Sequence, residues 1–169
     1  MAARRLAAVT ARRRGLAPVV AADTRVLILG SFPGEASLAA RAYYAHPRNH
    51  FWPLLAAILG EALSSMTYEA RIARLLAHRI GVWDTIVACE REGSLDASIR
   101  SPSRAQARRV RAQAPNIARV CFNGGTAARA TRQWRDAGYS TLALPSSSPA
   151  YTRPFAEKLA AWRAIADHL

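Results

Sequence analysis

Four short apolar runs, each followed by a loop and a helical segment, restrict this chain to one class of fold. The runs cover residues 25–30, 82–88, 119–122 and 141–144, and they are rich in β-branched and aliphatic residues. Strands that alternate with helices predict a parallel sheet covered on both faces, with right-handed crossovers. We therefore expect an α/β fold of three layers, α/β/α, around a central four-stranded and mainly parallel sheet.

Helix signals fill the intervals between these runs. Thr67 is placed to cap a helix over residues 68–80, and Ser103 to cap a short basic helix over residues 104–113. The polar segment 89–103 contains Gly93 and is expected to be a loop. Further helices are expected over residues 35–42, 49–60, 126–136 and 154–169.

The length of 169 residues favours a single domain, which we expect over residues 18–169 behind a basic arm of residues 1–17 without regular structure. A chain of this size buries about two thirds of the surface that its unfolded form exposes, so it needs no metal or disulfide to fold. Cys89 and Cys121 belong to no CxxC or Cys/His cluster. We expect no zinc or iron–sulfur site, and a reduced cytoplasm suits both thiols.

The charge balance favours an anionic partner. There are 24 basic and 11 acidic residues, a net charge of +13, and binding to a phosphate backbone gains from counterion release. Because Lys158 is the only lysine, a general bias of composition towards arginine is the competing explanation.

No apolar run approaches the roughly 20 residues of a membrane span, and the start lacks the apolar core of a signal peptide. Arg-rich starts also occur in organelle targeting, which remains the alternative to the cytoplasmic, nucleoid-associated location that we expect.

A ligand of such a sheet sits beyond the carboxyl ends of its strands. Those ends bring together residues 31–49, 84–94, 123–125 and 145–153. Common catalytic patterns such as GxGxxG, the phosphate-binding GxxxxGK[ST], HExxH and GxSxG are missing from the sequence. Carboxylates are few there, which gives little support to a two-carboxylate glycosidase mechanism. Pro47 prevents His46 and His50 from forming a regular helical metal-binding pair, so no metal site is expected.

Five ordered motifs carry a resemblance to a known family. They are GSFPGEASL, YYAHPRNHFW, VWDTIVACEREGSLDASI, VCFNG and LPSSSPA. Over residues 19–162 the chain resembles the uracil-DNA glycosylase superfamily, and most closely its hypoxanthine-DNA (deoxyinosine) glycosylase branch. The resemblance implies a uracil-DNA glycosylase-like fold, damaged DNA as the partner and no cofactor.

The resemblance implies that Asn49 is the catalytic residue. Relatives that recognise mismatched uracil carry an asparagine in a GINPG motif, and the matching position here is Phe32. The role of positioning water therefore passes to Asn49 in the HPRN segment. An amide can hold water against C1′ once the glycosidic bond has largely broken. The alternative is that Asn49 only caps the helix that follows it.

The same resemblance implies which residues bind the base. Backbone amides around residues 31–34 would cradle its carbonyl oxygen, and Tyr44 would stack on it, with Tyr43 an equal candidate. His46 would brace the loop by hydrogen bonds. The strand ends supply the remaining candidates, which are also suited to turns or caps. The predicted base-binding set is Ser31, Phe32, Pro33, Gly34, Tyr44, His46, Asp84, Thr85 and Asn123.

The last motif, LPSSSPA, matches the family loop that enters the minor groove and pinches phosphates. Uracil-specific relatives carry a catalytic histidine where this chain has Leu144, and Tyr151 departs from the branch's pattern after SPA. Basic residues would hold the flanking backbone, although a solvated helix face is the alternative for those at 104–111. The predicted DNA-binding set is Ser146, Ser147, Ser148, Pro149, Arg153, Arg104 and Arg108.

We therefore expect a monomeric, monofunctional DNA glycosylase of base-excision repair that flips out a deaminated base, above all hypoxanthine, and leaves an abasic site. No amine nucleophile is expected in the pocket, because Lys158 falls in the C-terminal helix, so no lyase step and no cofactor are expected. The alternatives are a uracil or broad deaminated-base glycosylase and a nucleic-acid-binding module without activity. A nucleoside hydrolase is disfavoured, since free nucleosides do not require a charge of +13.

Overall fold

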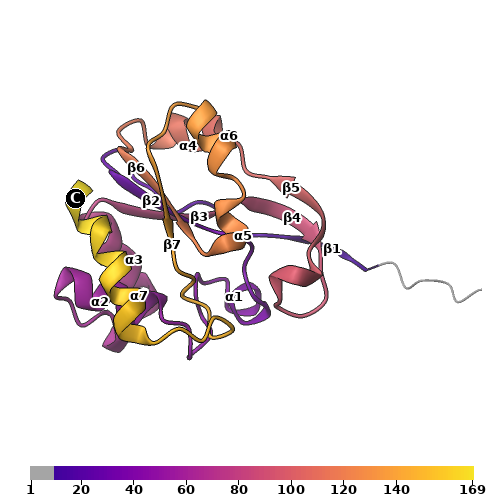
Figure 1. Ribbon diagram of the computed structural model, residues 1–169, viewed down its shortest axis with the longest axis horizontal. Coiled ribbons are helices and arrows are strands. Elements are labelled where there is room, and N and C mark those ends of the chain that lie inside the picture. Colours follow the sequence, from indigo (N-terminus) through magenta and orange to yellow (C-terminus); the bar gives the residue numbers. More distant parts are fainter. Residues whose placement is uncertain (1–9) are drawn as a thin grey trace, which may run out of the picture.

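A parallel sheet forms the centre of the computed structural model, which describes residues 10–169 (Figure 1). Its strands run in the order β3-β2-β6-β7 and all pairs are parallel. They are β2 (Val26–Gly30), β3 (Ile80–Asp84), β6 (Arg119–Asn123) and β7 (Thr141–Leu144). Every residue of β2 is buried, as expected for a strand with parallel neighbours on both sides. The predicted α/β class and four-stranded sheet are confirmed.

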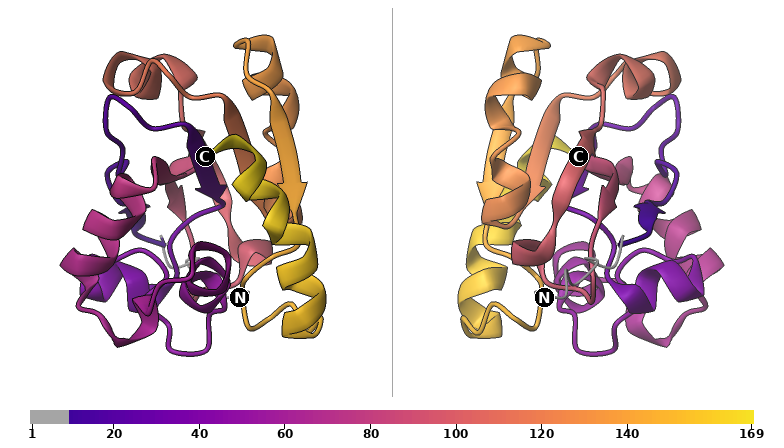
Figure 2. Two further views of the ribbon diagram at one scale, coloured as in Figure 1. Left: turned by 90° about the vertical axis from the view of Figure 1, so that its left-hand side faces the viewer. Right: turned by 90° about the vertical axis from the view of Figure 1, so that its right-hand side faces the viewer.

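Helices cover both faces of this sheet, and the alternation of side chains along β2 explains how (Figure 2). Val26 and Ile28 pack against α2 (Phe51–Leu59), α3 (Tyr68–Ala77) and α7 (Phe155–Trp162). Leu27 and Leu29 point the other way, toward α4 (Ala107–Gln113), α5 (Gly125–Ala128) and α6 (Thr131–Asp136). The short elements α1 (Glu35–Ala40), η1 (Leu63–Ser65) and η3 (Arg163–His168) complete the layers.

Most predicted helix ends are found where the sequence places them. The Thr67 hydroxyl accepts a hydrogen bond from the Ala70 amide at 3.2 Å, and Gly60 ends α2 in the left-handed conformation with φ of 66°. The expected helix over residues 126–136 is divided into α5 and α6, and the last helix tightens into η3 after Trp162.

A second, antiparallel sheet was not anticipated. It consists of β1 (Arg12–Arg14), β4 (Ile86–Glu90) and β5 (Arg100–Arg104) in the order β1-β4-β5. The strand predicted over residues 82–88 is divided at Thr85: residues 82–84 belong to β3, and residues 86–88 belong to β4, which leaves the parallel sheet. The predicted loop over residues 89–103 is wrong, since it contains the 3₁₀ helix η2 (Asp96–Ser98) and most of β5.

Two further predictions change with this sheet. The basic helix begins at Ala107 and not at residue 104, so Ser103 lies in β5 and caps nothing. The arm expected over residues 1–17 gives way to regular structure at Arg12, where β1 pairs with β4, and its first nine residues lie outside the described part. Within residues 10–169, no helix combines the length and apolar character needed to cross a membrane.

Candidate active site

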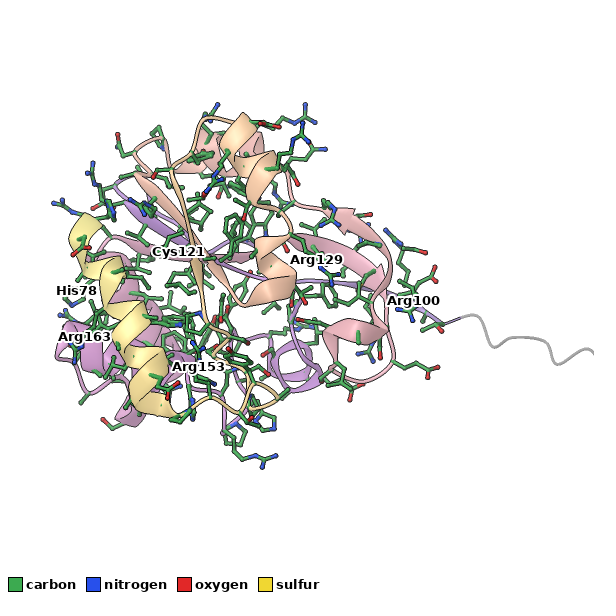
Figure 3. All side chains as sticks on the ribbon, viewed as in Figure 1. His78, Arg100, Cys121, Arg129, Arg153 and Arg163 are labelled. Atoms are coloured by element: carbon green, nitrogen blue, oxygen red, sulfur yellow. The ribbon has the colours of Figure 1, made fainter. Side chains whose placement is uncertain are left out.

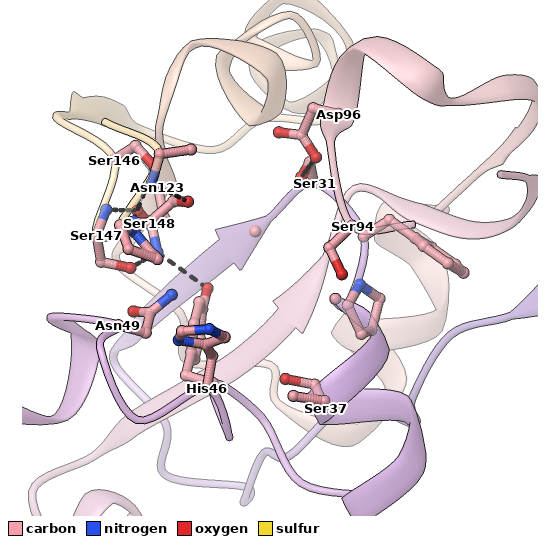
Figure 4. Close-up of a pocket in the computed structure, with 18 of the residues that line it drawn as sticks. Ser31, Ser37, His46, Asn49, Ser94, Asp96, Asn123, Ser146, Ser147 and Ser148 are labelled. Atoms are coloured by element: carbon pink, nitrogen blue, oxygen red, sulfur yellow. Dashed lines mark hydrogen bonds between the residues drawn. The ribbon is translucent and has the colours of Figure 1, made fainter. Parts of the chain in front are cut away.

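A cavity of about 440 Å³ opens where the parallel strands end (Figure 4). The loop after β2 forms its floor, while the loop before α2, the loop after β4 and the loop after β7 form its walls. All four segments that were expected to meet at the carboxyl ends of the strands contribute to it. The predicted residues that line it are Ser31, Phe32, Pro33, Gly34, Tyr44, His46, Asn49, Asp84, Asn123, Ser146, Ser147, Ser148 and Pro149.

Four predicted residues do not line this cavity. Thr85 is 1% exposed at the junction of β3 and β4, where its carbonyl accepts the Ala105 amide at 2.8 Å. Arg104 belongs to β5 and Arg108 to the exposed side of α4. Arg153 lines an adjoining groove, beside the Glu157 carboxylate at 3.3 Å.

Gly30 allows the floor and two side chains to converge. A Cβ at this position would lie 2.5 Å from Oδ1 of Asp84 and 2.9 Å from the Tyr44 hydroxyl, both closer than van der Waals contact permits. This glycine is therefore required by close approach, since any side chain would displace one of the two polar groups from the cavity.

The floor after Gly30 presents backbone donors. Within the described residues the amides of Ser31, Phe32 and Gly34 donate to no other group. Arg91 holds the segment from behind, because its guanidinium donates to the Pro33 carbonyl and lies 4.9 Å from the centre of the Phe32 ring. The floor is thus a rigid loop with amides available to an acceptor on a ligand.

Asp84 is a buried carboxyl in the cavity wall. It is 4% exposed, and its Oδ2 has no hydrogen-bond partner in the described structure. Burial, followed by the nearby Asp96 carboxylate, raises the pKa of Asp84 to about 8, although Arg91 opposes the rise. At neutral pH this side chain is mainly a carboxylic acid, which can donate a proton to a hydrogen bond as well as accept one.

The Asn49 side chain contacts the start of α2 and also lines the cavity, while the N-cap position of α2 is occupied by His50. Its Oδ1 accepts the Phe51 amide at 2.9 Å at the start of α2, and its backbone N–H donates to the His46 carbonyl at 3.0 Å. The same side chain lines the cavity and the adjoining groove. The contact with the helix end therefore fixes the amide group without removing it from the cavity.

The two neighbouring tyrosines differ in their surroundings. Tyr43 is 3% exposed, and its hydroxyl donates to the Ala17 carbonyl at 2.9 Å. Tyr44 has a left-handed backbone with φ of 54°, and its ring stacks on Phe51 with 3.8 Å between centroids. Burial raises the pKa of both tyrosines, so both hydroxyls stay protonated. One face of Tyr44 is thus already covered by a protein ring.

Asn123 ties the serine loop, defined here as residues 145–149, to the sheet. Its Oδ1 accepts the Ser147 amide at 2.8 Å, and its Nδ2 donates to the Ser147 hydroxyl at 2.8 Å and to the Tyr44 hydroxyl at 3.1 Å. Both amide hydrogens of Asn123 are therefore engaged by protein groups (Figure 4).

Further contacts fix the serine loop from below. Lys158 in α7 is fully buried, and its Nζ donates to the Ser148 carbonyl at 3.3 Å without lining the cavity. Trp162 donates to the Pro145 carbonyl at 2.8 Å, and the His50 amide to Ser147 at 2.9 Å. The loop is thus preorganised before any ligand arrives.

The wall opposite the serine loop continues beyond the expected segment 84–94 to Leu95 and Asp96, which were not among the predicted site residues. The Ser94 hydroxyl accepts the Glu35 amide at 2.9 Å, and the Ser31 hydroxyl donates to Oδ1 of Asp96 at 2.7 Å, so this segment is bonded to the floor. Leu95 lies between them and lines the cavity, as does Tyr151 on the other side. The sequence GSLD (residues 93–96) belongs to one of the five motifs shared with the family. Because this segment was expected to be an irregular loop, none of its residues was included in the predicted site.

His46 lies at the cavity edge, where its Nδ1 accepts the Arg48 amide at 3.1 Å. In the part of the chain that the structure describes, no group of three or more His, Cys, Asp or Glu side chains is placed to hold a metal ion.

Comparison with known proteins places this geometry in a family. The profile described as the uracil DNA glycosylase superfamily matches residues 17–169. Hypoxanthine DNA glycosylase of Methanosarcina barkeri (strain Fusaro / DSM 804) is 38% identical over 151 residues, which cover 89% of this chain and 96% of the relative. The protein of the same name in Methanosarcina acetivorans is 36% identical over 156 residues, covering 92% and 99%.

A solved structure agrees with the sequence relatives. The solution NMR structure of a candidate uracil DNA glycosylase from Methanosarcina acetivorans superimposes with a TM-score of 0.80 at 35% identity. The superposition covers 92% of this chain and 99% of that one.

Proposed function

This chain belongs to the uracil DNA glycosylase superfamily, and from that premise we propose how its cavity removes a base. The chain is a DNA glycosylase that acts on hypoxanthine in damaged DNA and hydrolyses the N-glycosidic bond. The roles that we propose for these residues rest on one observation, which is that Asn49, Asp84 and the free amides of the floor converge on one cavity. Its volume lies within the range of about 300–1,000 Å³ that is usual for small-molecule sites.

Asn49 positions the attacking water. A carbonyl oxygen has two lone pairs, and the Phe51 amide occupies one of those on Oδ1, which leaves the other to accept a hydrogen bond from water. Because the helix end fixes the orientation of the amide, the water is held where C1′ of a flipped nucleotide arrives. An amide is a weak base, so the water reacts after the glycosidic bond has largely broken.

Asp84 and the floor stabilise the departing base. Hypoxanthine gains negative charge as it leaves, and donors aimed at its acceptor atoms lower the barrier. The protonated carboxyl of Asp84 is such a donor, and the amides of Ser31 and Gly34 are further ones. A carboxylate at the same place would repel the leaving group, so the raised pKa of Asp84 is part of the mechanism.

The domain of residues 18–169 also includes β1, which pairs with β4, and it acts as a monomer. The serine loop contacts the DNA backbone, and Tyr44 lies against the extruded base. The product is an abasic site without strand cleavage, because the Lys158 amine is held under the serine loop and does not line the cavity.

Strand cleavage at abasic sites tests the proposal. Duplexes with one deoxyinosine, uracil, xanthine or normal base are incubated with the protein and divided, and only one half is treated with alkali. We expect alkali-dependent breaks at deoxyinosine. Asn49→Ala should lower the rate on the order of a hundredfold, as for other positioned polar groups in active sites.

Asn116→Ala provides the matched control, since Asn116 is exposed and bonds only the Ala22 carbonyl at 3.1 Å. Breaks without alkali would contradict the absence of a lyase step. Equal rates for Asn49→Ala and the control would contradict the role given to Asn49.

A further inference from the structure

Arg91 is the only buried arginine among residues 10–169. Its side chain is 2% exposed, whereas Arg100, Arg129, Arg153 and Arg163, which Figure 3 labels, are exposed. A guanidinium stays charged in a protein, so its removal from water costs free energy that a carboxylate partner normally offsets. No carboxylate of residues 10–169 lies within ion-pair distance of Arg91. The buried charge therefore has a reason other than an ion pair.

The guanidinium of Arg91 contacts the floor of the cavity from behind. Its Nη2 donates to the Pro33 carbonyl, and its centre lies 4.9 Å from the centre of the Phe32 ring. Nε and Nη1 have no hydrogen-bond partner in the described structure. Phe32 and Pro33 line the cavity, but Arg91 does not. Within the described residues, the hydrogen bonding of this guanidinium is thus directed at one carbonyl of the floor.

The peptide between Pro33 and Gly34 links this charge to the cavity. The peptide is trans, so its C=O and N–H bonds point in opposite directions, and the Gly34 N–H points away from Arg91. Gly34 lines the cavity, and its amide donates to no other group in residues 10–169. A carbonyl that accepts from a cation is polarised more strongly, and hydrogen bonds in a chain strengthen one another. The Gly34 N–H is therefore a stronger donor than an ordinary backbone amide.

We propose that Arg91 is a positioning residue for base release, which strengthens the Gly34 N–H as a donor to the departing base by binding the carbonyl of the same peptide. The proposal rests on the glycosylase function given above and extends its machinery to a residue outside the cavity. When the glycosidic bond breaks, its electron pair leaves with the base, and water adds to C1′ and gives up a proton. The strengthened donor gains most as negative charge grows on the base, so it favours the transition state over the bound substrate.

The charge of Arg91 also acts on Asp84, the second donor in the cavity. Burial and the Asp96 carboxylate raise the pKa of Asp84 to about 8, and Arg91 lowers it. Loss of the charge should therefore raise this pKa further. The other titratable or charged groups near these two residues stay unchanged in the variants below, and they are Arg13, Glu35, Tyr43, Tyr44, Cys89 and Asp96.

Three variants separate the charge of Arg91 from its hydrogen bond. Arg91→Lys keeps a charged donor, Arg91→Gln keeps a neutral donor, and Arg91→Met keeps neither. The rate of base release is measured at pH 7 on a deoxyinosine duplex in single turnover with saturating protein. Arg91→Gln and Arg91→Met should lower the rate on the order of tenfold, a part of the roughly hundred- to thousandfold lost with a whole donor. Arg91→Lys should stay within about threefold of the wild type, and Kd for the duplex should change less than about twofold in all three.

Arg71→Gln is the matched control. The Arg71 guanidinium also donates to a backbone carbonyl, that of Leu63 at 2.8 Å, and lies 5.4 Å from the centre of the Trp52 ring, but it does not line the cavity. The control should release the base at the wild-type rate. A wild-type rate in Arg91→Gln, or an equal loss in Arg91→Lys and Arg91→Gln, would show that the side chain only holds the loop and would overturn the proposal. These two variants decide the question even if Arg91→Met does not fold.

NMR spectroscopy gives a measurement that is independent of activity. The ¹⁵N shift of Gly34 reports the polarisation of the peptide that it shares with Pro33, and the ¹³C shift of the Asp84 carboxyl against pH reports its pKa. Arg91→Gln should displace the Gly34 shift and move the Asp84 titration to higher pH, whereas Arg91→Lys should leave both near the wild type. Identical Gly34 shifts in the three proteins would overturn the proposal. If the wild type released no base, the proposed function would fail, and the NMR result would still decide whether the charge of Arg91 acts through this peptide.

Discussion

Replacing Asp84 with asparagine should stabilise the protein at neutral pH and remove part of its pH dependence. The pKa of the buried carboxyl is raised from 3.8 to about 8. The folded state therefore keeps a proton that the unfolded chain releases above pH 3.8, so the free energy of unfolding falls as the pH rises through this window. Asparagine has nearly the same shape and no proton to lose.

The size of the effect follows from the same values. Between pH 3.8 and pH 7 the difference grows over about three pH units, at about 1.4 kcal/mol for each. Asp84→Asn should thus raise the free energy of unfolding by up to about 4 kcal/mol at pH 7 and by very little at pH 4. Urea denaturation of both proteins at pH 4, 5, 6, 7 and 8 measures this widening gap.

The pH dependence of base release should also reflect the protonation of Asp84. In the wild type the rate falls above about pH 8, because ionised Asp84 can no longer donate to the departing base. In Asp84→Asn the amide remains a donor at every pH, so this alkaline fall should disappear. If the rate of Asp84→Asn still falls at alkaline pH as in the wild type, the fall comes from ionisation of the substrate or of another residue.

Asp136→Asn is the control, since its carboxylate is 72% exposed in an ion pair with Arg132. Equal stability profiles for the wild type and both variants would refute the assignment of a buried, protonated carboxyl.

Three further outcomes follow from contacts in and beside the cavity. Gly30→Ala places a methyl group 2.5 Å from the Asp84 carboxyl, so it should cost roughly 1–3 kcal/mol in thermal or urea unfolding and lower the deoxyinosine rate on the order of tenfold or more. Asn123→Ala leaves the buried Ser147 amide without its acceptor, and should lower the free energy of unfolding by about 1–3 kcal/mol in urea titrations. Arg153→Ala should reduce the slope of log Kd for duplex DNA against log salt by about one, because one phosphate contact is lost.

Residues of the same type elsewhere in the chain supply the controls for these three variants. Gly125→Ala has open space around the new methyl group and an ordinary φ, so it should be silent. Asn116→Ala tests whether loss of any asparagine contact has the same effect as Asn123→Ala. Arg132→Ala removes a positive charge that is 94% exposed on α6; a slope reduced as much as in Arg153→Ala would show that only net charge matters.

The parallel sheet was predictable because its strands are local signals. Each of β2, β6 and β7 is a short apolar run that ends at or before a glycine, an asparagine or a proline, and these runs are found at their predicted positions within a residue or two. The parallel direction of the strands then placed the loops at one edge, so most of the cavity lining followed from topology.

The antiparallel sheet was not predictable from local signals. The run VWDTIVACE is continuous in apolar character, and only the Asp84-Thr85 pair marks the point where the chain changes sheets. The strand β5 has the sequence RSPSR, which has low strand propensity and contains Pro102. It is a strand because β4 offers it a partner and because proline is tolerated at an edge. The segment around Leu95, which connects β4 to β5 and lines one wall of the cavity, was therefore not predicted either.

The pairing of β1 with β4 bears on how this protein should be handled. The family profile begins at residue 17, after β1 has ended. A chain trimmed to that boundary would lose Arg12–Arg14, and the backbone of β4 from Ala88 to Glu90 would become an open edge. Such edges pair with other molecules and promote aggregation. A boundary drawn from family similarity would thus cut away the residues that keep the second sheet closed on one side.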